Sequence, residues 1–425
     1  MTPAERIPIL GFSQEPAAFL AQHYRPALFG VAFGSAVSIM GSIAVSQILL
    51  GVGLVLVMLG PRQLDLPPIK LPLALFFAAT VAADLLSGHP LAGLPQIRKL
   101  YVFGMIVVVT YAFDSAKQIR NLVIAWTGVG VLAAGAGFAE VMARHKEALS
   151  LKWNTYDYYL DDRIKGFSSH WMTFGAEQMI TLLMLFSFLL FACPRSWRVA
   201  GWCCAAVLWV SLMLGLTRCI FLLGLPLGML YLLWSFKPWT VVMIPAVALV
   251  SYASVPFQVR ERVKSVITPH GDLDSNAQRS VSRLAGWEMV KAHPWFGVGP
   301  EQIKPQFDSY VPKTVHRPLP HGWYGHLHNI YLQYAAERGI AALIFLMWMI
   351  GKMAYDFIRH LRSGNVTPEC KFVLHGTIAV IISVLAEGFF EYNLGDSEVL
   401  TMFLVATTGA YVVMRRETHI CQHHS

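Results

Sequence analysis

A histidine and an asparagine stand directly before a long apolar stretch and could carry out acid–base chemistry. His328 and Asn329 open a helix predicted over 328–358, and Gly339 follows His328 by eleven residues, about three helical turns. His328 and Gly339 then share one face of that helix, where small residues let another helix approach. The positive end of the helix dipole disfavours a protonated imidazole, so we expect a neutral His328 that can act as a general base. A histidine that only caps the helix or bonds at an interface is the alternative.

One arginine interrupts an otherwise apolar stretch, LGLTRCIFLLG. Arg218 has no acidic neighbour in the sequence, and its planar guanidinium group offers a fork of donors that matches phosphate oxygens. These features favour a role for Arg218 in binding an anion. An arginine that reaches the membrane surface from a helix end is the alternative interpretation.

Further basic residues fall in the same predicted outer region of the protein. Arg279 and Arg283 lie four residues apart, so a helix would place them on one face. Arg163 belongs to a second outward loop, and Arg98 and Lys99 fall near the outer end of a predicted span. These residues predict a cationic patch, although simple solvation of a loop helix would also explain the first pair.

Two patterns could hold a metal ion. Asp272-Leu273-Asp274 is an Asp-x-Asp pair, but Gly271 and Ser275 beside it are typical of a turn. A nitrogen-rich site could come from four histidines, which are His316, His321, His326 and His328. The six cysteines match no zinc motif. We therefore predict neither a metal site nor a cofactor.

The composition indicates which elements must position these residues. Of 425 residues, 55% are hydrophobic and only 14% charged, whereas a soluble chain carries about a quarter charged residues. A helix that spans the bilayer needs about 20 apolar residues, which leaves room for roughly a dozen spans. A secreted enzyme, a nucleic-acid-binding protein and a disordered adaptor are excluded, despite the net charge of +8.

Apolar stretches predict an all-α polytopic membrane protein with about twelve transmembrane helices. The predicted spans are 26–41, 43–60, 70–87, 98–113, 119–140, 172–193, 197–215, 217–236, 238–257, 328–358, 371–392 and 397–414. Lys and Arg gather in the short loops on one side, so both termini should be cytoplasmic. Residues 1–425 form a single membrane domain in this prediction. Two longer loops, 141–171 and the larger 258–327 between helices 9 and 10, face outward, and the larger one forms a helical roof.

Three ordered segments of the chain, within roughly residues 163–345, resemble the O-antigen ligases and their polymerase relatives. The segments are His328-Asn329 followed by Gly339, Leu216-Thr217-Arg218, and Arg283-Leu284 to Trp287 with His293-Pro294-Trp295-Phe296-Gly297-Val298-Gly299. The chain departs from the family at the neighbours of Thr217-Arg218 and at Ala342, where a second glycine is common. These departures affect the subfamily more than the superfamily.

The resemblance implies a GT-C-like membrane glycosyltransferase without a metal. Such an enzyme moves O-antigen polysaccharide from undecaprenyl pyrophosphate to a sugar of the lipid A-core at the periplasmic face of the bacterial inner membrane. It implies that His328 is the base of an inverting displacement, with Asn329 and Gly339 in support. It also implies that Arg218 and Arg283 bind the pyrophosphate, with weaker help from Arg279, Arg163, Arg98 and Lys99.

Three other functions remain open from the sequence. An O-antigen polymerase would use similar arginines to extend a lipid-linked glycan, and a protein O-oligosaccharyltransferase would use a similar histidine with a protein acceptor. A transporter of lipid-linked oligosaccharide would also pair cations with an apolar path, but transporters commonly bind near the membrane midplane between repeats. The outward bias of the charges and the lack of a repeat argue against the transporter, and the relatively compact chain favours the ligase.

Overall fold

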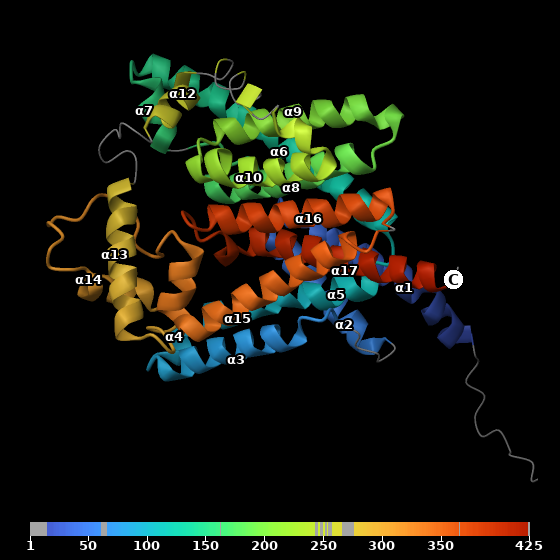
Figure 1. Cartoon of the computed structure of the whole chain (residues 1–425). Helices are drawn as coiled ribbons and strands as arrows, with labels where there is room; N and C mark the ends of the chain where they lie inside the picture. Colours follow the sequence, from blue (N-terminus) through green and yellow to red (C-terminus); the bar gives the residue numbers. More distant parts are fainter. Residues whose placement is uncertain are drawn as a thin grey trace, which may run out of the picture.

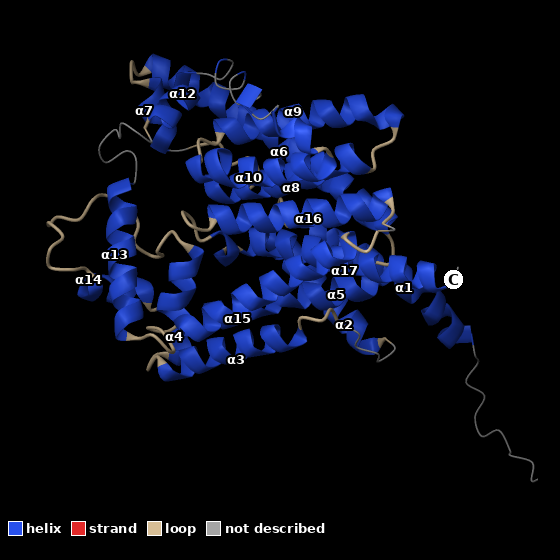
Figure 2. Ribbon diagram, viewed as in Figure 1, coloured by secondary structure: helices blue, strands red, loops and turns tan. Residues whose placement is uncertain are grey.

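The computed structural model describes residues 15–60, 66–161, 163–242, 245–246, 250, 253, 257–265, 276–364 and 366–423. Every regular element within these ranges is a helix, and Figure 2 shows no strand among them. The all-α prediction is therefore confirmed for the described part of the chain.

The helices follow one another with short connections. Their bounds are α1 Glu15–Ser38, α2 Ile43–Leu59, α3 Lys70–Leu86, α4 Pro90–Lys99, α5 Gly104–Ala112, α6 Ala116–Ser150, α7 Thr155–Asp161, α8 Trp171–Phe191, α9 Arg198–Leu214, α10 Leu225–Phe236, α12 Phe257–Lys264, α13 Asn276–Ala292, α14 Ile303–Tyr310, α15 Ile330–Leu361, α16 Pro368–Glu387 and α17 Ser397–His423. Short 3-10 turns or a π-turn link several of them: η1 Leu100–Phe103, η2 Arg195–Trp197, η3 Ile220–Gly224, η4 Pro238–Val242 and η6 Asn393–Gly395.

The long helices lie side by side in a bundle, with α3 on α15, α8 on α16 and α1 on α2 (Figure 1). One large apolar core runs through the bundle and includes the fully buried Trp126, Phe357 and Phe372. Helix α13 crosses one end of the bundle and packs on α15 and α14 over a smaller apolar cluster around Met289 and Phe307. The described part of the predicted large loop therefore forms a helical cover at one end.

Seven stretches within the described residues are long and apolar enough to cross a membrane. They are Pro90–Ala112, Ala116–Ser150, Trp171–Phe191, Arg195–Leu214, Ile330–Leu361, Pro368–Glu387 and Ser397–Thr418, and two shorter apolar helices cover Ile43–Leu59 and Ile220–Phe236. Each predicted span overlaps one or more helices, although half of the residues of 238–257 lie outside the described ranges. The count of twelve spans and the GT-C-like architecture stay predictions.

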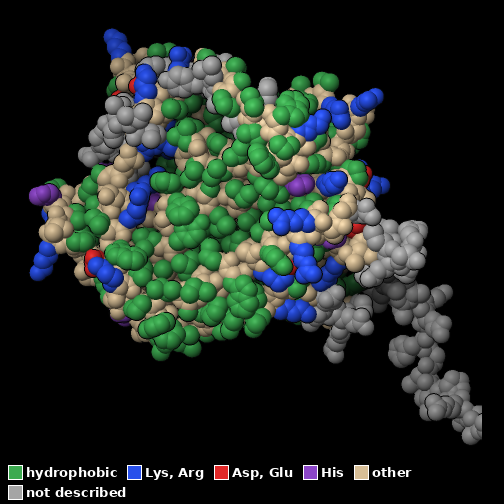
Figure 3. Space-filling model, viewed as in Figure 1, with side chains coloured by type: hydrophobic (Ala, Val, Ile, Leu, Met, Phe, Trp, Pro, Cys, Tyr) green, Lys and Arg blue, Asp and Glu red, His purple; other side chains and the backbone are tan. Residues whose placement is uncertain are grey.

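The outer surface of the bundle is apolar, as a lipid-facing surface must be. Side chains such as Ile48, Met58, Leu85 and Val199 are exposed to between 66% and 76%, and burying them in lipid removes that apolar area from water. On the face in Figure 3, hydrophobic side chains form a broad band, and Lys and Arg lie mostly at the two ends, most densely beside the C-terminus. The chain is a multi-pass membrane protein.

Two helices differ from the predicted bounds in ways that affect the site. Helix α6 continues to Ser150, so the loop predicted at 141–171 begins inside a helix. Helix α15 begins at Ile330 and is broken at Gly339, where φ is 87° and ψ is 163°. The expectation that one regular helix places His328 and Gly339 on the same face is therefore wrong.

Candidate functional site

A cavity of about 800 Å³ opens at the end of the bundle that α13 covers. Its polar lining comes from segments far apart in the sequence. Basic side chains are Lys99, Arg163, Arg218, Arg262 and Arg279; histidines are His170, His321, His326 and His328; acidic side chains are Glu391, Asp396 and Glu398. The cavity therefore combines groups that can bind an anion with groups that can transfer a proton.

His328 lies immediately before α15, and the residue after it fixes its position. Asn329 is the N-cap of α15, because its side-chain oxygen accepts a hydrogen bond from the Leu332 backbone N–H at 2.8 Å. The Asn329 amide nitrogen also donates to the Phe389 carbonyl at 3.0 Å, which ties the start of α15 to the loop after α16. The predicted supporting residue Asn329 thus lies outside the cavity lining and holds the backbone beside His328.

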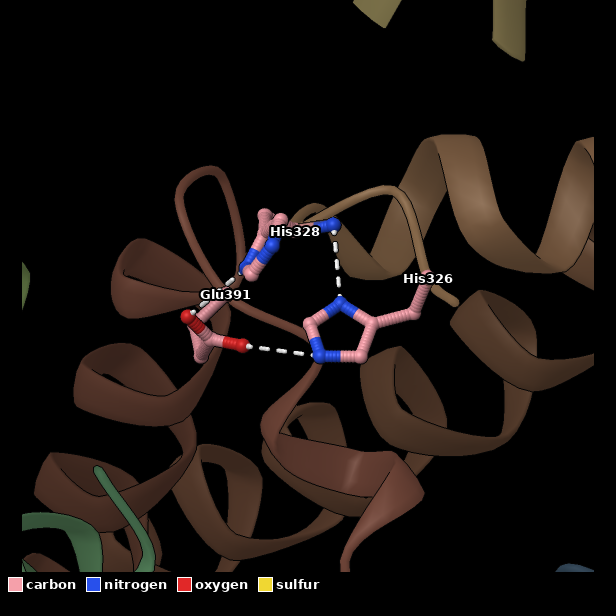
Figure 4. Close-up of side chains that lie close together, drawn as sticks. All are labelled: His326, His328 and Glu391. Carbon is pink, nitrogen blue, oxygen red and sulfur yellow. Dashed lines mark hydrogen bonds and ion pairs between the residues drawn. The ribbon is translucent and has the colours of Figure 1, made fainter. Parts of the chain in front are cut away.

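A buried carboxylate and an amide face the two ring nitrogens of His328. Its Nδ1 lies 3.4 Å from Glu391 Oε2, and its Nε2 lies 3.4 Å from the Gln278 amide nitrogen. Figure 4 shows His328 and Glu391 pointing toward one another, with His326 on the other carboxylate oxygen. A carboxylate on Nδ1 and an amide donor beside Nε2 favour the tautomer that carries its proton on Nδ1. Nε2 is then the basic atom.

Glu391 holds several positive or polar groups together. Its Oε2 also lies 3.4 Å from the Arg279 Nη2 atom, and its Oε1 lies 3.8 Å from His326 Nε2. Burial alone would raise the pKa of Glu391, but the hydrogen bond and charge of His328, with the charges of His326 and Arg279, lower it to about 2. Glu391 is therefore a fixed negative charge at the working pH.

His326 is the second imidazole of this cluster. Its Nδ1 accepts a hydrogen bond from the His328 backbone N–H at 3.2 Å. Burial lowers the pKa of His326 to about 4, although the neighbouring Glu391 carboxylate acts in the opposite direction. A neutral His326 positions the backbone of His328, whose φ of 50° is unusual for a residue other than glycine.

Arg218 projects from a break between two helices. Leu216, with φ of 50°, ends the turn after α9, and a π-turn follows at η3. Arg218 Nη1 donates to the backbone oxygen and the hydroxyl of Ser265, both at 3.2 Å, and Nη2 donates to the Asn276 side-chain oxygen at 2.7 Å. These bonds aim the guanidinium group at the cavity.

The other predicted cations separate into two groups. Arg163 is buried, donates to the Leu160 carbonyl at 3.2 Å and stacks on Trp171 at 5.1 Å, while Lys99 donates to the Gly395 carbonyl at 2.8 Å. Both line the cavity together with Arg279. Arg98 and Arg283 are exposed and do not line it. Arg283 instead lies over the Phe390 ring at 5.7 Å.

Gly339 joins two of the sequence segments singled out above. At the break in α15 the Ile340 N–H donates to the Pro294 carbonyl at 2.9 Å, and the Val298 N–H donates to the Ala336 carbonyl at 2.8 Å. A Cβ atom at Gly339 would meet the Trp295 carbonyl oxygen at 1.9 Å. Glycine is required here by the close approach and the positive φ. Gly339 therefore anchors the covering loop and contributes no group to the cavity.

Sequence reasoning missed several residues that line the cavity, among them Glu391, Arg262 and Gln278. Arg262 is buried and donates to the Leu216 carbonyl at 3.2 Å. The acidic segment EGFFEYNLGDSE, which has no Lys or Arg, is the sequence signal that could have indicated Glu391. No sequence signal distinguished Gln278.

Within the described residues, one group of side chains in the cavity could hold a metal ion. One atom each of His326, His328 and Glu391 lie within 4.8 Å of one another. A cation there would compete with Arg279, which already neutralises Glu391. The predicted Asp272-Leu273-Asp274 pair lies outside the described residues.

Comparison with known proteins identifies part of the chain. A family model described as O-antigen ligase matches residues 203–347, about a third of the chain. This segment includes Arg218, Arg279, His328 and Gly339, whereas Glu391 follows it. No curated protein matches the chain. On this match, residues 203–347 are similar to the O-antigen ligase family.

Proposed function

We propose that the protein is an O-antigen ligase, which transfers O-antigen polysaccharide from undecaprenyl pyrophosphate to a sugar of the lipid A-core. One observation carries the proposal: His328, hydrogen-bonded to Glu391, lines the same cavity as Lys99, Arg163 and Arg279 and the aimed Arg218. A base and a set of cations are the two things that this transfer requires. The family match supports the same reaction class.

The cations act on the leaving group. A diphosphate carries its negative charge on oxygens that guanidinium groups bind with charge-assisted, often bidentate hydrogen bonds. Arg279 has a spare donor for this role, because its buried Nε atom has no hydrogen-bond partner among the described residues. Fixed positive charges that line the cavity stabilise the charge that develops as the diphosphate leaves. In this proposal they make a metal ion unnecessary.

His328 acts on the acceptor. A hydroxyl of the lipid A-core takes the place of the Gln278 amide next to Nε2 and gives up its proton there as its oxygen bonds to the anomeric carbon. The bond from that carbon to the phosphate oxygen breaks, and the diphosphate leaves with the electron pair. A single displacement inverts the anomeric configuration. Glu391 stabilises the imidazolium that forms, as the carboxylate of a catalytic triad does.

Arg283 and Arg98 have smaller parts in this mechanism than the sequence predicted. Because both are exposed and outside the lining, we assign them at most to long-range attraction of the anionic donor. Lys99 and Arg163, which were expected only to assist, lie closer to the proposed reaction.

The proposed orientation places the cavity at the periplasmic face of the inner membrane and both termini in the cytoplasm. Support comes from the distribution of charge, since on the face drawn in Figure 3 Lys and Arg cluster beside the C-terminus, at the end opposite the one that α13 covers. Cytoplasmic loops carry this excess in membrane proteins.

The test is transfer by the purified protein in detergent, with lipid-linked glycan as donor and lipid A-core as acceptor, in excess chelator. The proposal predicts a glycan-bearing lipid A-core and no loss of rate with chelator. Three results contradict it in different ways: longer lipid-linked glycan indicates a polymerase, glycan on an added protein acceptor indicates a protein O-oligosaccharyltransferase, and no transfer without sealed compartments agrees with a transporter. A rate abolished by chelator would place a metal in the reaction.

A further inference from the structure

A second group of metal-binding side chains lies at the opposite end of the bundle from the cavity. His360 is near the end of α15, Cys370 is in the first turn of α16, and Glu417 is near the end of α17. One ligand atom from each lies within 4.8 Å of the others. Three helices that are separate in the sequence therefore present three different ligand types to one point.

The cluster is enclosed by protein. Cys370 is 1% exposed, and the side chains of His360 and Glu417 are 16% and 8% exposed. His360 Nε2 lies 2.8 Å from Glu417 Oε2. The Cys370 thiol also hydrogen-bonds to the Glu417 carboxylate, so a single carboxylate brings the imidazole and the thiol together.

We propose that His360, Cys370 and Glu417 bind one divalent transition-metal ion, Zn²⁺ in preference to Mg²⁺ or Ca²⁺. Thiolate, imidazole and carboxylate are the ligands that Zn²⁺ uses, whereas Mg²⁺ and Ca²⁺ prefer oxygen alone. Around a tetrahedral Zn²⁺ the ligand atoms lie about 3.5 Å apart, as its bond lengths of about 2.0–2.3 Å require. When the metal ion binds, rotation of the side chains separates His360 and Glu417 slightly and brings the Cys370 thiolate toward the ion. A water molecule takes the fourth position.

The surroundings of the cluster already orient one ligand. The Thr367 backbone N–H donates to Glu417 Oε1 at 2.6 Å, which leaves Oε2 directed at the cluster. The Thr367 hydroxyl accepts a hydrogen bond from the Cys370 N–H at 3.3 Å and so caps α16. Bonds to the far side of a ligand are typical of metal sites, because they fix its direction and raise its affinity.

The place of the site in the fold indicates its role. The other end of α15 carries His328, and the loop between α16 and α17 carries Glu391. A metal ion that joins these three helices fixes them against one another on the side away from the cavity. It would act as a structural clamp that stabilises the bundle, and the proposed chemistry would not pass through it.

The test measures metal binding directly on the full-length protein in detergent. The C-terminal sequence offers ligands of its own, so every variant is made in a background with Ala at His419, Cys421, His423 and His424. The protein is stripped with chelator, loaded with Zn²⁺, desalted and analysed for metal content. Titration with Co²⁺ gives a second readout, because a cobalt–thiolate bond produces a near-ultraviolet charge-transfer band.

The proposal predicts about one Zn²⁺ per chain, a Co²⁺–thiolate band and a higher thermal midpoint with Zn²⁺. Cys370→Ala is expected to remove the band, and Cys370→Ala and Glu417→Gln to weaken Zn²⁺ binding by more than the roughly 10–100-fold loss typical of a group that only orients a ligand. Cys193→Ala, at another buried cysteine, is the control that keeps both. Two results would overturn the proposal. One is absence of the band in the background protein with Cys370 intact, which does not depend on how the variant folds. The other is a Cys370→Ala protein that retains as much Zn²⁺ as the background protein. Neither result depends on transferase activity.

Discussion

Replacing Glu391 with Gln tests the proton-transfer half of the mechanism with the least change of shape. The amide keeps the volume of the carboxylate and can still accept a hydrogen bond from His328 Nδ1, which lies 3.4 Å away. It removes the negative charge that stabilises the imidazolium when His328 takes the proton. The step most affected is therefore glycan transfer itself.

The size of the effect follows from the geometry. Two unit charges about 4 Å apart interact by about 4 kcal/mol at an effective dielectric constant of about 20. Glu391 also neutralises Arg279, so the loss in the variant includes an uncompensated positive charge near the imidazolium. An increase of about 3–4 kcal/mol in the activation free energy corresponds to a fall of about 10²- to 10³-fold in kcat. The KM for the lipid-linked donor should change much less, because the carboxylate does not bind the diphosphate.

The assay is steady-state transfer to lipid A-core at saturating donor. Asp396→Asn is the matched control, since Asp396 lines the same cavity and accepts a hydrogen bond from Thr173 at 3.0 Å. Burial, with the charges of Glu391 and Glu398, raises the pKa of Asp396 to about 7, so its loss removes only part of a charge at neutral pH. We expect a reduction of less than about tenfold. A Glu391→Gln enzyme within about threefold of the unmutated kcat would refute the role given to this carboxylate.

Three further changes test other parts of the account. Gly339→Ala should lower the free energy of unfolding by about 2–4 kcal/mol through strain and the clash with Trp295. Gly351→Ala, where a Cβ atom meets nothing, should raise the thermal midpoint slightly. Equal thermal midpoints for the two variants would contradict this. Burial lowers the pKa of His326 from 6.5 to about 4. As the pH falls through this range, His326 therefore binds a proton in the unfolded chain but not in the folded one. Stability should then drop by about 3 kcal/mol, and His326→Gln should flatten the dependence of the midpoint on pH; parallel curves would rule this out. Arg218→Lys keeps the charge but loses the planar fork, and should reduce kcat/KM for the donor by about 10- to 100-fold; an unchanged value would remove Arg218 from the diphosphate site.

The helical membrane fold could be predicted from the sequence because lipid imposes a simple rule. Backbone groups in the bilayer must bond within their own helix, so a stretch of about 20 apolar residues has few alternatives. The ends of helices obey no such rule. Helix α6 runs on to Ser150 because its last turns lie beyond the apolar stretch, where hydropathy gives no signal. Gly339 breaks α15 because a loop about 40 residues earlier supplies the backbone partners, and local sequence cannot reveal that contact.

Sequence reasoning found residues of the cavity lining where a residue type is expensive to bury. Arg218 and His328 stood out because few reasons other than chemistry place them beside apolar helices. Glu391 did not, because a carboxylate in an acidic loop resembles ordinary solvent exposure until the fold brings Arg279 and two imidazoles to it. Arg283 lies outside the cavity lining, because helical spacing from Arg279 does not determine which residue of the pair faces the cavity.

The most direct test of the central claim is the rate of a single turnover by the His328→Ala enzyme, mixed with saturating lipid-linked donor and lipid A-core. Single turnover separates the transfer step from product release, and His316→Ala, an exposed histidine of the same loop outside the cavity lining, is the control. Loss of a general base predicts a fall of about 10²- to 10⁴-fold for His328→Ala with donor binding retained, and a normal rate for the control. A His328→Ala enzyme that transfers glycan at nearly the unmutated rate would contradict the claim that this imidazole takes the acceptor's proton.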